Sequence, residues 1–511
     1  FLHPSQRRLV HKDWNGPVRV LGTAGTGKTV VAMHRAAHLA RSPDQRLLFT
    51  TFTTNLAADI RANLLKLCPP DAMRRIRVTP IDAWVGELLK QAGYAYTIAY
   101  WRSETLEQHW NRALNEAPSG FDQEFFRDEW DLVVQAHGCQ TWEDYRSASR
   151  SGRGTRLGRS QRKAVWPVFE AYRNMLDKAG LREPEDALRD AEAMVAQGKV
   201  QPRFTAIVVD EAQDMSTSAF KLLRAAVPEG QNDLFIVGDG HQRIYRRHVV
   251  LGRAGVEIRG RSKRLRVNYR TTEEIRVFAE ALLQGVPVDD LDGSGDDPKG
   301  TRSLTRGQEP QVRRFDRFED EVASIAAWVQ EQAPERTCLM ARTRKQRDRY
   351  RAALEEAGIA TYCIERSKAE DATRPGLRLA TMHRVKGLEF DRVVLAGADA
   401  ATTPLISKVV APEDTAQRGE LWDMELSLLY VALTRARREV LITSVGEVSW
   451  ALPRPEPVAG GPDLSVSKTC PRCGATGTIG ELFGTRRMRS RSRAGAERVV
   501  VRAQSYCKDC R

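Results

Sequence analysis

The segment from Val18 to Leu39 constrains the fold more than any other part of the chain. It begins with a short apolar run, continues through the letters GTAGTGKT, and ends in a pattern that suits a helix. A glycine, four residues and then Gly-Lys-Thr is the spacing of a phosphate-binding loop at a helix N-terminus. A glycine-rich turn without a ligand is the alternative, but the order of strand, loop and helix favours the loop. The segment therefore predicts a site for a nucleoside triphosphate.

Each residue of this loop has an expected role. Lys28 would reach the β- and γ-phosphates, and the hydroxyl of Thr29 would ligate Mg²⁺. Glycines let the backbone curl with its N–H groups turned inward, toward an anion. The residues expected to contact the nucleotide here are Gly22, Thr23, Ala24, Gly25, Thr26, Gly27, Lys28 and Thr29.

Polar side chains also follow the apolar run at residues 207–209. Asp210 and Glu211 come directly after it, at the end where open parallel sheets bind ligands. We expect Asp210 to hold Mg²⁺ and Glu211 to polarise the attacking water. A further apolar run ends in the same manner at Asp239 and Gln242. Paired carboxylates behind a phosphate-binding loop predict that the nucleotide is hydrolysed.

Length and charge limit the class of protein. A chain of 511 residues predicts several domains. The formal net charge of +14 favours a polyanionic partner, nucleic acid first, with an ordinary basic surface as the alternative. No run of about eighteen apolar residues is present, so we expect nothing to cross a membrane. Without a signal-like start, the chain is expected to be cytoplasmic or a piece of a longer protein.

Alternating strand-like and helix-like segments predict an α/β fold with two parallel-sheet domains. Apolar residues change to a helical spacing over residues 85–200, which predicts a helical insertion in the first domain. The expected bounds are 1–84 and 201–275 for the first sheet domain, 85–200 for the insertion, 276–448 for the second sheet domain, 449–468 for a linker and 469–511 for a small C-terminal domain.

Tryptophans and a basic loop distinguish the insertion. The tryptophans are Trp101, Trp110, Trp130, Trp142 and Trp166. We expect them in a core, with platforms for nucleobases as the alternative. The loop SRSGRGTRLGRS at residues 149–160 is expected to be mobile and solvated, although its charge also suits a DNA clamp.

Eight segments over residues 2–445 resemble, in order, the motifs of superfamily 1 helicases of the UvrD/Rep type. They are the Gln6 segment, GTAGTGKT, TTFTTNLAAD, VDEAQD, VGDGHQRIY, NYR, TMHRVKGLEF and YVALTRAR. The resemblance implies two RecA-like domains of the P-loop NTPase type that face each other across ATP. It also implies an ATP-dependent helicase or translocase that moves 3′ to 5′ on single-stranded DNA, alone or at junctions with duplex, and whose cleft closure drives the movement.

The same resemblance implies roles at the nucleotide. Gln6 would read the adenine edge, Tyr269 would stack on the base, and Glu389 would accept hydrogen bonds from the ribose hydroxyls. The residues expected around the γ-phosphate, from both domains, are Gln242, Arg270 and Arg435. Arginine suits this task because its planar, permanently charged fork pairs with phosphate oxygens.

A single-strand track is implied as well. Its expected contacts are Phe52, Thr53, Thr79, Trp84, Tyr245 and His383. Aromatic rings stack on bases without sequence preference, and ordinary packing is an equal alternative for Phe52 and Tyr245. The chain departs from the family at Arg246 and Arg247, where a stacking tryptophan is common, and at Asp82, where histidine is common. The segment between NYR and TMHRVKGLEF is also too short to hold the large accessory insertion of UvrD and Rep.

Two other functions stay open from the sequence. The letters VVAMHRAAHL also resemble the loop helix of HelD, a UvrD relative that remodels RNA polymerase, although no coiled-coil arm is present. The other function is that of a zinc-binding module, in which the motor half only regulates attachment. Stimulation of the ATPase by bare single-stranded DNA separates the helicase from both.

The C-terminal segment carries two CxxC pairs behind a linker rich in proline and glycine. Cys470, Cys473, Cys507 and Cys510 predict a zinc ribbon with four thiolates on one Zn²⁺, with disulfides as the alternative. Residues 464–511 hold eleven Lys and Arg against three acidic residues, a net charge of +8. We expect this tail to contact nucleic-acid phosphates, or else an acidic protein partner.

Overall fold

The computed structural model describes residues 2–100, 103–115, 117–150, 153, 155–245, 249–296, 300–364, 374–405, 409, 415–453, 467–469, 473, 475–478, 485–491 and 497–503. The chain divides into two compact units, Phe1–Ala451 and Leu452–Arg511. Within the described ranges, no helix combines the length and the apolar composition needed to cross a bilayer.

The first sheet has the strand order β3-β2-β6-β7-β1-β8, and every neighbouring pair is parallel. Its strands are β1 (Val18–Gly22), β2 (Leu47–Thr51), β3 (Ile76–Pro80), β6 (Ala206–Val209), β7 (Leu234–Gly238) and β8 (Ser262–Leu265). The helices around it are α1 (Pro4–His11), α2 (Lys28–Leu39), α3 (Thr54–Leu67), α4 (Pro70–Met73), α5 (Ile81–Gln91) and α11 (Thr217–Ala225).

The four central strands β1, β2, β6 and β7 are buried, which explains why they are rich in apolar residues. Successive residues of a strand point to opposite faces, so Val20 packs with Val31 of α2 whereas Leu21 packs in the cluster of α5 and α11. The predicted α/β fold with parallel sheets is confirmed.

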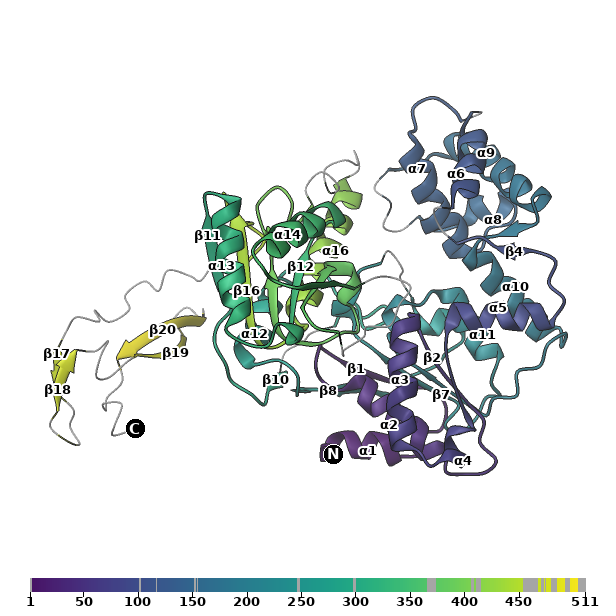
Figure 1. The fold of residues 1–511 in the computed structure, drawn as a ribbon. Coiled ribbons are helices and arrows are strands. Elements are labelled where there is room, and N and C mark those ends of the chain that lie inside the picture. The colour runs from purple at the N-terminus through teal and green to yellow at the C-terminus, as the bar shows by residue number, and fades with distance from the viewer. Residues whose placement is uncertain are drawn as a thin grey trace. The chain divides into compact units, whose positions relative to one another are not determined.

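Helices follow β4 (Thr97–Ile98), which pairs with β5 (Leu181–Arg182). They are α6 (Glu104–Leu114), α7 (Gln123–Glu129) with a π-helical turn at Trp130–Gln135, α8 (Trp142–Ser147), α9 (Arg159–Lys178) and α10 (Pro184–Ala196). In Figure 1, α6 to α9 form a group beyond α10. Trp110, Trp130 and Trp166 lie in the core of this group and Trp142 packs against it, whereas Trp101 lies outside the described residues.

Two arginines of the basic loop have buried side chains, whereas Arg156 and Arg159 are exposed, as expected for a solvated loop. The side chains of Arg150 and Arg153 are 7% and 2% exposed, and both form ion pairs with the fully buried Glu129. A buried carboxylate must be paired, because its desolvation is otherwise uncompensated. Glu129 therefore holds both guanidinium groups against the helical core.

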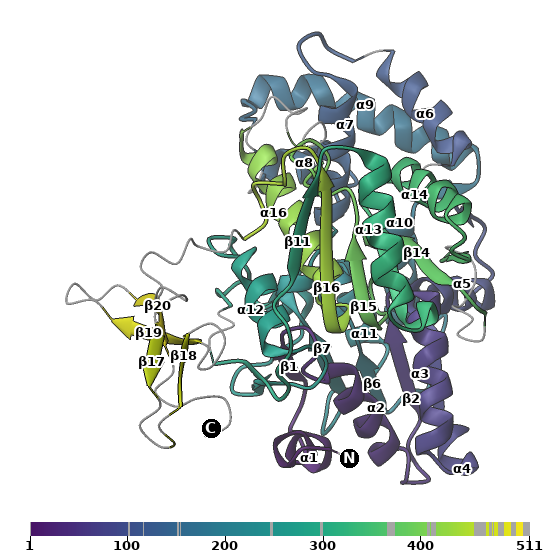
Figure 2. The ribbon, with the colours of Figure 1, turned by 60° about the vertical axis from the view of Figure 1, so that its left-hand side comes forward.

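The second sheet has the order β11-β16-β15-β12-β14-β13, again with every pair parallel. Figure 2 shows β11, β16 and β15 of this sheet side by side, and α13 and α14 pack in one hydrophobic cluster against the sheet. Its strands are β11 (Gln311–Phe315), β12 (Thr337–Ala341), β13 (Thr361–Cys363), β14 (Leu377–Thr381), β15 (Phe390–Leu395) and β16 (Ala436–Val445). The associated helices are α12 (Glu273–Ala281), α13 (Phe318–Gln330), α14 (Arg344–Glu356) and α16 (Thr415–Leu433).

The described residues of the C-terminal unit form two antiparallel strand pairs. They are β17 (Ser467–Thr469) with β18 (Thr476–Thr478), and β19 (Thr485–Arg491) with β20 (Glu497–Ala503). Cys473 lies between β17 and β18 and is exposed. Cys470, Cys507 and Cys510 lie outside the described residues, as do Arg246 and Arg247. The described part of the chain contains no group of side chains suited to a metal, so the zinc ribbon stays a prediction.

Candidate functional site

The phosphate-binding loop joins β1 to α2. Gly25 and Gly27 have φ angles of 77° and 79°, which favour glycine. A Cβ on Gly25 would stand 2.2 Å from Oδ1 of Asn268, so the loop is also too close to β9 (Val267–Asn268) for a side chain. In the part of the chain that the structure describes, no side chain caps α2, and its first turn contains no acidic residue. The helix therefore offers its N-terminal N–H groups to an anion.

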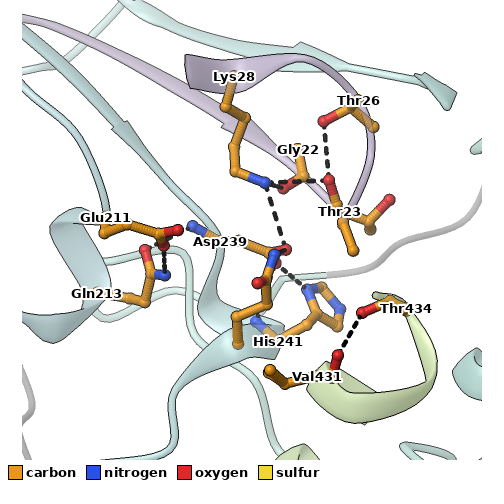
Figure 3. A network of polar contacts seen from close by, with 12 residues as sticks. Gly22, Thr23, Thr26, Lys28, Glu211, Gln213, Asp239, His241, Val431 and Thr434 are labelled. Carbon is orange, nitrogen blue, oxygen red and sulfur yellow. Dashed lines mark hydrogen bonds and ion pairs between the residues drawn. The ribbon is translucent and has the colours of Figure 1, made fainter. Parts of the chain in front are cut away.

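Lys28 is held at the mouth of this loop. Its ammonium donates to the carbonyls of Gly22 and Thr23 at 2.8 and 3.0 Å and lies 3.4 Å from Oδ2 of Asp239 (Figure 3). Burial opposes the charged form of Asp239, but Lys28 and a hydrogen bond from His241 outweigh it and lower the pKa of this carboxyl. The charged pair places a cation where a phosphate would bind.

Asp210 directly follows β6 and is 1% exposed. Its Oδ1 accepts from the Glu211 N–H at 2.9 Å, while the buried Oδ2 has no hydrogen-bond partner among the described residues. Burial and the charge of Glu211 raise the pKa of Asp210 to about 7, against a hydrogen bond from Thr29. Oδ2 of Asp210 and the Thr29 hydroxyl are oxygen ligands of the kind that Mg²⁺ prefers. A bound Mg²⁺ would favour the charged form of the carboxylate.

Glu211 is positioned by a side chain that sequence reasoning missed. Its φ of 53° lies in the left-handed region, which non-glycine residues seldom adopt outside functional sites. The amide of Gln213 donates to Oε2 of Glu211 and accepts from the Asp239 N–H at 2.9 Å. Gln213 thus fixes the carboxylate against β7. The signal in the sequence is the position of Gln213 in VDEAQD, two residues after Glu211.

An arginine of the second sheet domain completes this network. Arg435 donates through Nη2 to Oε1 of Gln242 at 3.0 Å, and Gln242 donates to Oδ2 of Asp239 at 2.6 Å. Arg435 is 2% exposed, and burial together with the charge of Arg270 lowers its pKa to about 10. The structure thus brings Gln242 and Arg435 together. Gln242 in turn bonds Asp239, the carboxylate that pairs with Lys28.

The residues expected at the adenine contact the backbone of the loop. The Gln6 side chain donates to the Thr26 carbonyl at 3.1 Å and accepts from the His3 N–H at 3.1 Å. Tyr269 is 38% exposed, and its ring centroid lies 6.3 Å from that of His3. Both expected residues are therefore beside the loop, and His3 is an additional ring that the sequence did not single out.

Among the expected DNA contacts, Trp84 needs correction. It is 2% exposed and packs in the core with its ring 6.0 Å from Phe204, so it cannot stack on a base. Helical spacing on α5 does not distinguish a core face from an exposed one at a single tryptophan. Thr79 is also largely buried.

Other expected contacts are partly exposed. The rings of Phe52 and Tyr245 lie 5.3 Å apart, and His383 stands in the 3-10 helix Met382–Val385. The Thr53 hydroxyl accepts from the Leu56 N–H at 3.3 Å and so caps α3. Phe52 and Tyr245 thus form an aromatic pair beside the start of α3.

Two parallel-sheet domains, a phosphate-binding loop with paired carboxylates, and an arginine from the second domain define a nucleotide-hydrolysing enzyme of the P-loop class. Residues 2–248 match the family model of the UvrD/REP helicase N-terminal domain, and residues 365–447 match that of the UvrD-like helicase C-terminal domain. The chain belongs to the UvrD-like helicases of superfamily 1.

Relatives of this chain are also named as DNA helicases. DNA helicase IV of Escherichia coli (strain K12) is 28% identical, over 86% of this chain and 67% of the relative. ATP-dependent DNA helicase UvrD2 of Mycobacterium tuberculosis (strain H37Rv) is 25% identical, over 86% and 77%. A probable DNA helicase of Mycoplasma pneumoniae is 22% identical, over 88% and 84%. The HelD-like alternative gains no support from these relatives.

Proposed function

We propose that this chain is an ATP-dependent DNA helicase or translocase that moves 3′ to 5′ along single-stranded DNA. The connection from Lys28 through Asp239 and Gln242 to Arg435 supports the proposal most, because it joins the phosphate-binding loop to the second sheet domain. A nucleotide that replaces part of this network changes the contact between the domains. Closure and opening of the cleft would then step the chain along DNA.

The residues of the site divide the work of hydrolysis. Lys28 and the N-terminus of α2 bind the phosphates, and Thr29 and Asp210 would hold the metal. When bound, ATP would supply the phosphoanhydride bond, and Mg²⁺ would neutralise negative charge on the phosphate oxygens. Glu211, held by Gln213, takes a proton from the attacking water. Arg435 would stabilise negative charge that develops at the γ-phosphate.

Single-stranded DNA would be bound without sequence preference. Phe52 and Tyr245 offer aromatic faces for bases, and Thr53 and His383 offer polar groups for phosphates. The C-terminal unit adds phosphate contacts through its arginines and, as we propose, is stabilised by one Zn²⁺ on four cysteines. Without the family's large insertion, we expect robust translocation and weak unwinding of long duplexes.

The direction is tested with a single strand that carries a streptavidin block at one end or the other. A motor that moves 3′ to 5′ clears the block at the 5′ end only. Clearing of the 3′-end block alone would overturn the direction. An ATPase that bare single-stranded DNA does not stimulate would overturn the translocase itself and favour remodelling of a nucleic-acid-bound protein.

A further inference from the structure

A cavity of about 140 Å³ lies where the first sheet domain joins the helical insertion. Its walls come from Arg77 of β3, from α5, which leads into the insertion, and from residues 200–204, which return from α10 to β6. Phe204 precedes β6, whereas Asp210 follows it. At about 3.3 Å per residue, these two positions are roughly 20 Å apart. The cavity is therefore separate from the nucleotide site.

The floor of this cavity is apolar. Trp84 and Leu88 of α5 are 2% and 5% exposed, and Val200 is 9% exposed. The ring of Phe204 stands edge-on to that of Trp84, with the centroids 6.0 Å apart. An apolar cavity of about 150 Å³ holds one benzene molecule. The floor therefore has room for a single apolar side chain, and it is too small for a nucleoside.

The rim of the cavity is polar and cationic. Gln91, Gln201 and Arg203 are exposed there, and Arg203 forms no ion pair in the part of the chain that the structure describes. The side chain of Arg77 is 38% exposed and pairs with that of Glu87, which is 54% exposed. Because exposed ion pairs contribute little free energy, Glu87 would yield to another carboxylate at small cost. Two guanidinium groups are thus available to one carboxylate at the mouth.

We propose that this cavity binds the C-terminus of a partner protein whose last residue is apolar. The last side chain would fill the floor, and its free carboxylate would bind Arg77 and Arg203. The terminal residue is the one place in a protein where an apolar side chain and a carboxylate share a Cα. The amides of Gln91 and Gln201 would hydrogen-bond the backbone before that residue, which a free acid lacks. Acidic residues further back would be drawn to a chain of net charge +14.

The test uses the full chain and a short peptide that ends in Asp-Gly-Phe, labelled with fluorescein at its N-terminus. Fluorescence anisotropy should show saturable binding of one peptide per chain. An amide in place of the free C-terminus should weaken binding about tenfold or more, because charge-assisted hydrogen bonds are lost. A terminal Ser in place of Phe should weaken binding about tenfold or more, because the apolar ring is no longer buried.

Two variants remove the charge at the rim. Arg203→Gln and Arg77→Gln should each weaken the free-carboxylate peptide about tenfold and leave the affinity for the amidated peptide unchanged. Both positions reach the surface, so we expect the fold and the basal ATPase to persist. Arg74→Gln is the matched control, because Arg74 is also an exposed arginine in an ion pair, with Asp71, and does not line the cavity. It should bind both peptides as the wild type does.

Gln91→Trp tests the floor without a change of charge. A ring at this exposed rim position would cover the apolar floor, so both peptides should bind more weakly. N-acetyl-phenylalanine tests the source of the ligand, because it carries the same side chain and carboxylate without the preceding backbone. If this free acid binds as tightly as the peptide, the assignment to a protein C-terminus is overturned. Binding that neither amidation nor Arg203→Gln weakens, or no saturable binding at all, would overturn the site itself.

Discussion

Arg270 of the first sheet domain donates to the carboxylate of Glu389 in the second, which Arg437 also holds through Nη2 at 2.9 Å. Burial opposes the charged form of Glu389, but the two guanidinium groups outweigh it and lower its pKa. The pair is therefore formed at neutral pH and is lost only as the pH falls through this lowered pKa. Two residues expected to bind the γ-phosphate and the ribose bind each other instead, so nucleotide binding should exchange this contact for others.

Glu389→Gln should remove the preference for a ribose with both hydroxyls. We expect the KM for ATP to rise about tenfold, because the neutral amide accepts a weaker hydrogen bond than a carboxylate. The ratio of kcat/KM for ATP and 3′-deoxy-ATP measures the effect. The exposed Glu447, replaced by Gln, is the control, and an unchanged ratio in Glu389→Gln would refute the ribose contact.

Lys28→Ala should weaken nucleotide binding and abolish turnover together. We propose that its ammonium meets the phosphates, and a charge-assisted hydrogen bond contributes about 1.5–3 kcal/mol, or about tenfold or more in Kd. Titration with a fluorescent ATP analogue and an ATPase assay measure both. Lys12→Ala, an exposed lysine 4.4 Å from the Trp14 ring, should change neither. Normal affinity in Lys28→Ala would contradict the loop assignment.

Glu211→Gln should bind ATP normally but hydrolyse it about 10²–10⁴-fold more slowly, because the water loses its base. Single-turnover hydrolysis, measured beside nucleotide affinity, distinguishes the two effects. Glu229→Gln, at an exposed carboxylate, is the control. Near-normal turnover in Glu211→Gln would show that another group activates the water.

Purified protein should carry about one zinc per chain on the four C-terminal cysteines. Cys507→Ser should release the metal and unfold the C-terminal unit, because the binding free energy of a structural zinc is folding free energy for a small domain. Motor ATPase should persist, since Phe1–Ala451 forms a separate compact unit. Elemental analysis and NMR of the tail check this, and a folded tail without metal would refute the site.

Deletion of residues 464–511 should flatten the salt dependence of single-stranded DNA binding. Each phosphate that the tail neutralises contributes about 0.7 to the slope of log K against log salt. Replacing Arg486, Arg487, Arg489 and Arg491 of β19 by Gln should reproduce most of the effect with the tail in place. The direction of translocation should not change in either variant. An equal slope in all three proteins would exclude the tail from DNA binding.

The sequence alone determined the elements whose geometry is local. A strand, a glycine loop and a helix place Lys28 at the helix N-terminus wherever they occur, and a parallel sheet brings its carboxyl ends to one edge. Asp210 and Gln242 therefore stand at that edge as the sequence predicts. The order of motifs likewise identified the family, and Arg435 meets Gln242 across the two domains.

Only the tertiary structure decided which side chains pair across long stretches of chain. Lys386 with Asp214, and Arg153 with Glu129, join segments whose periodicity says nothing about their partners. The burial of Trp84 was equally hidden, because a tryptophan at helical spacing fits a core face and a DNA face alike. Motifs fix local backbone geometry, whereas the pairing of charges and the burial of rings depend on which distant segments come together in the folded chain.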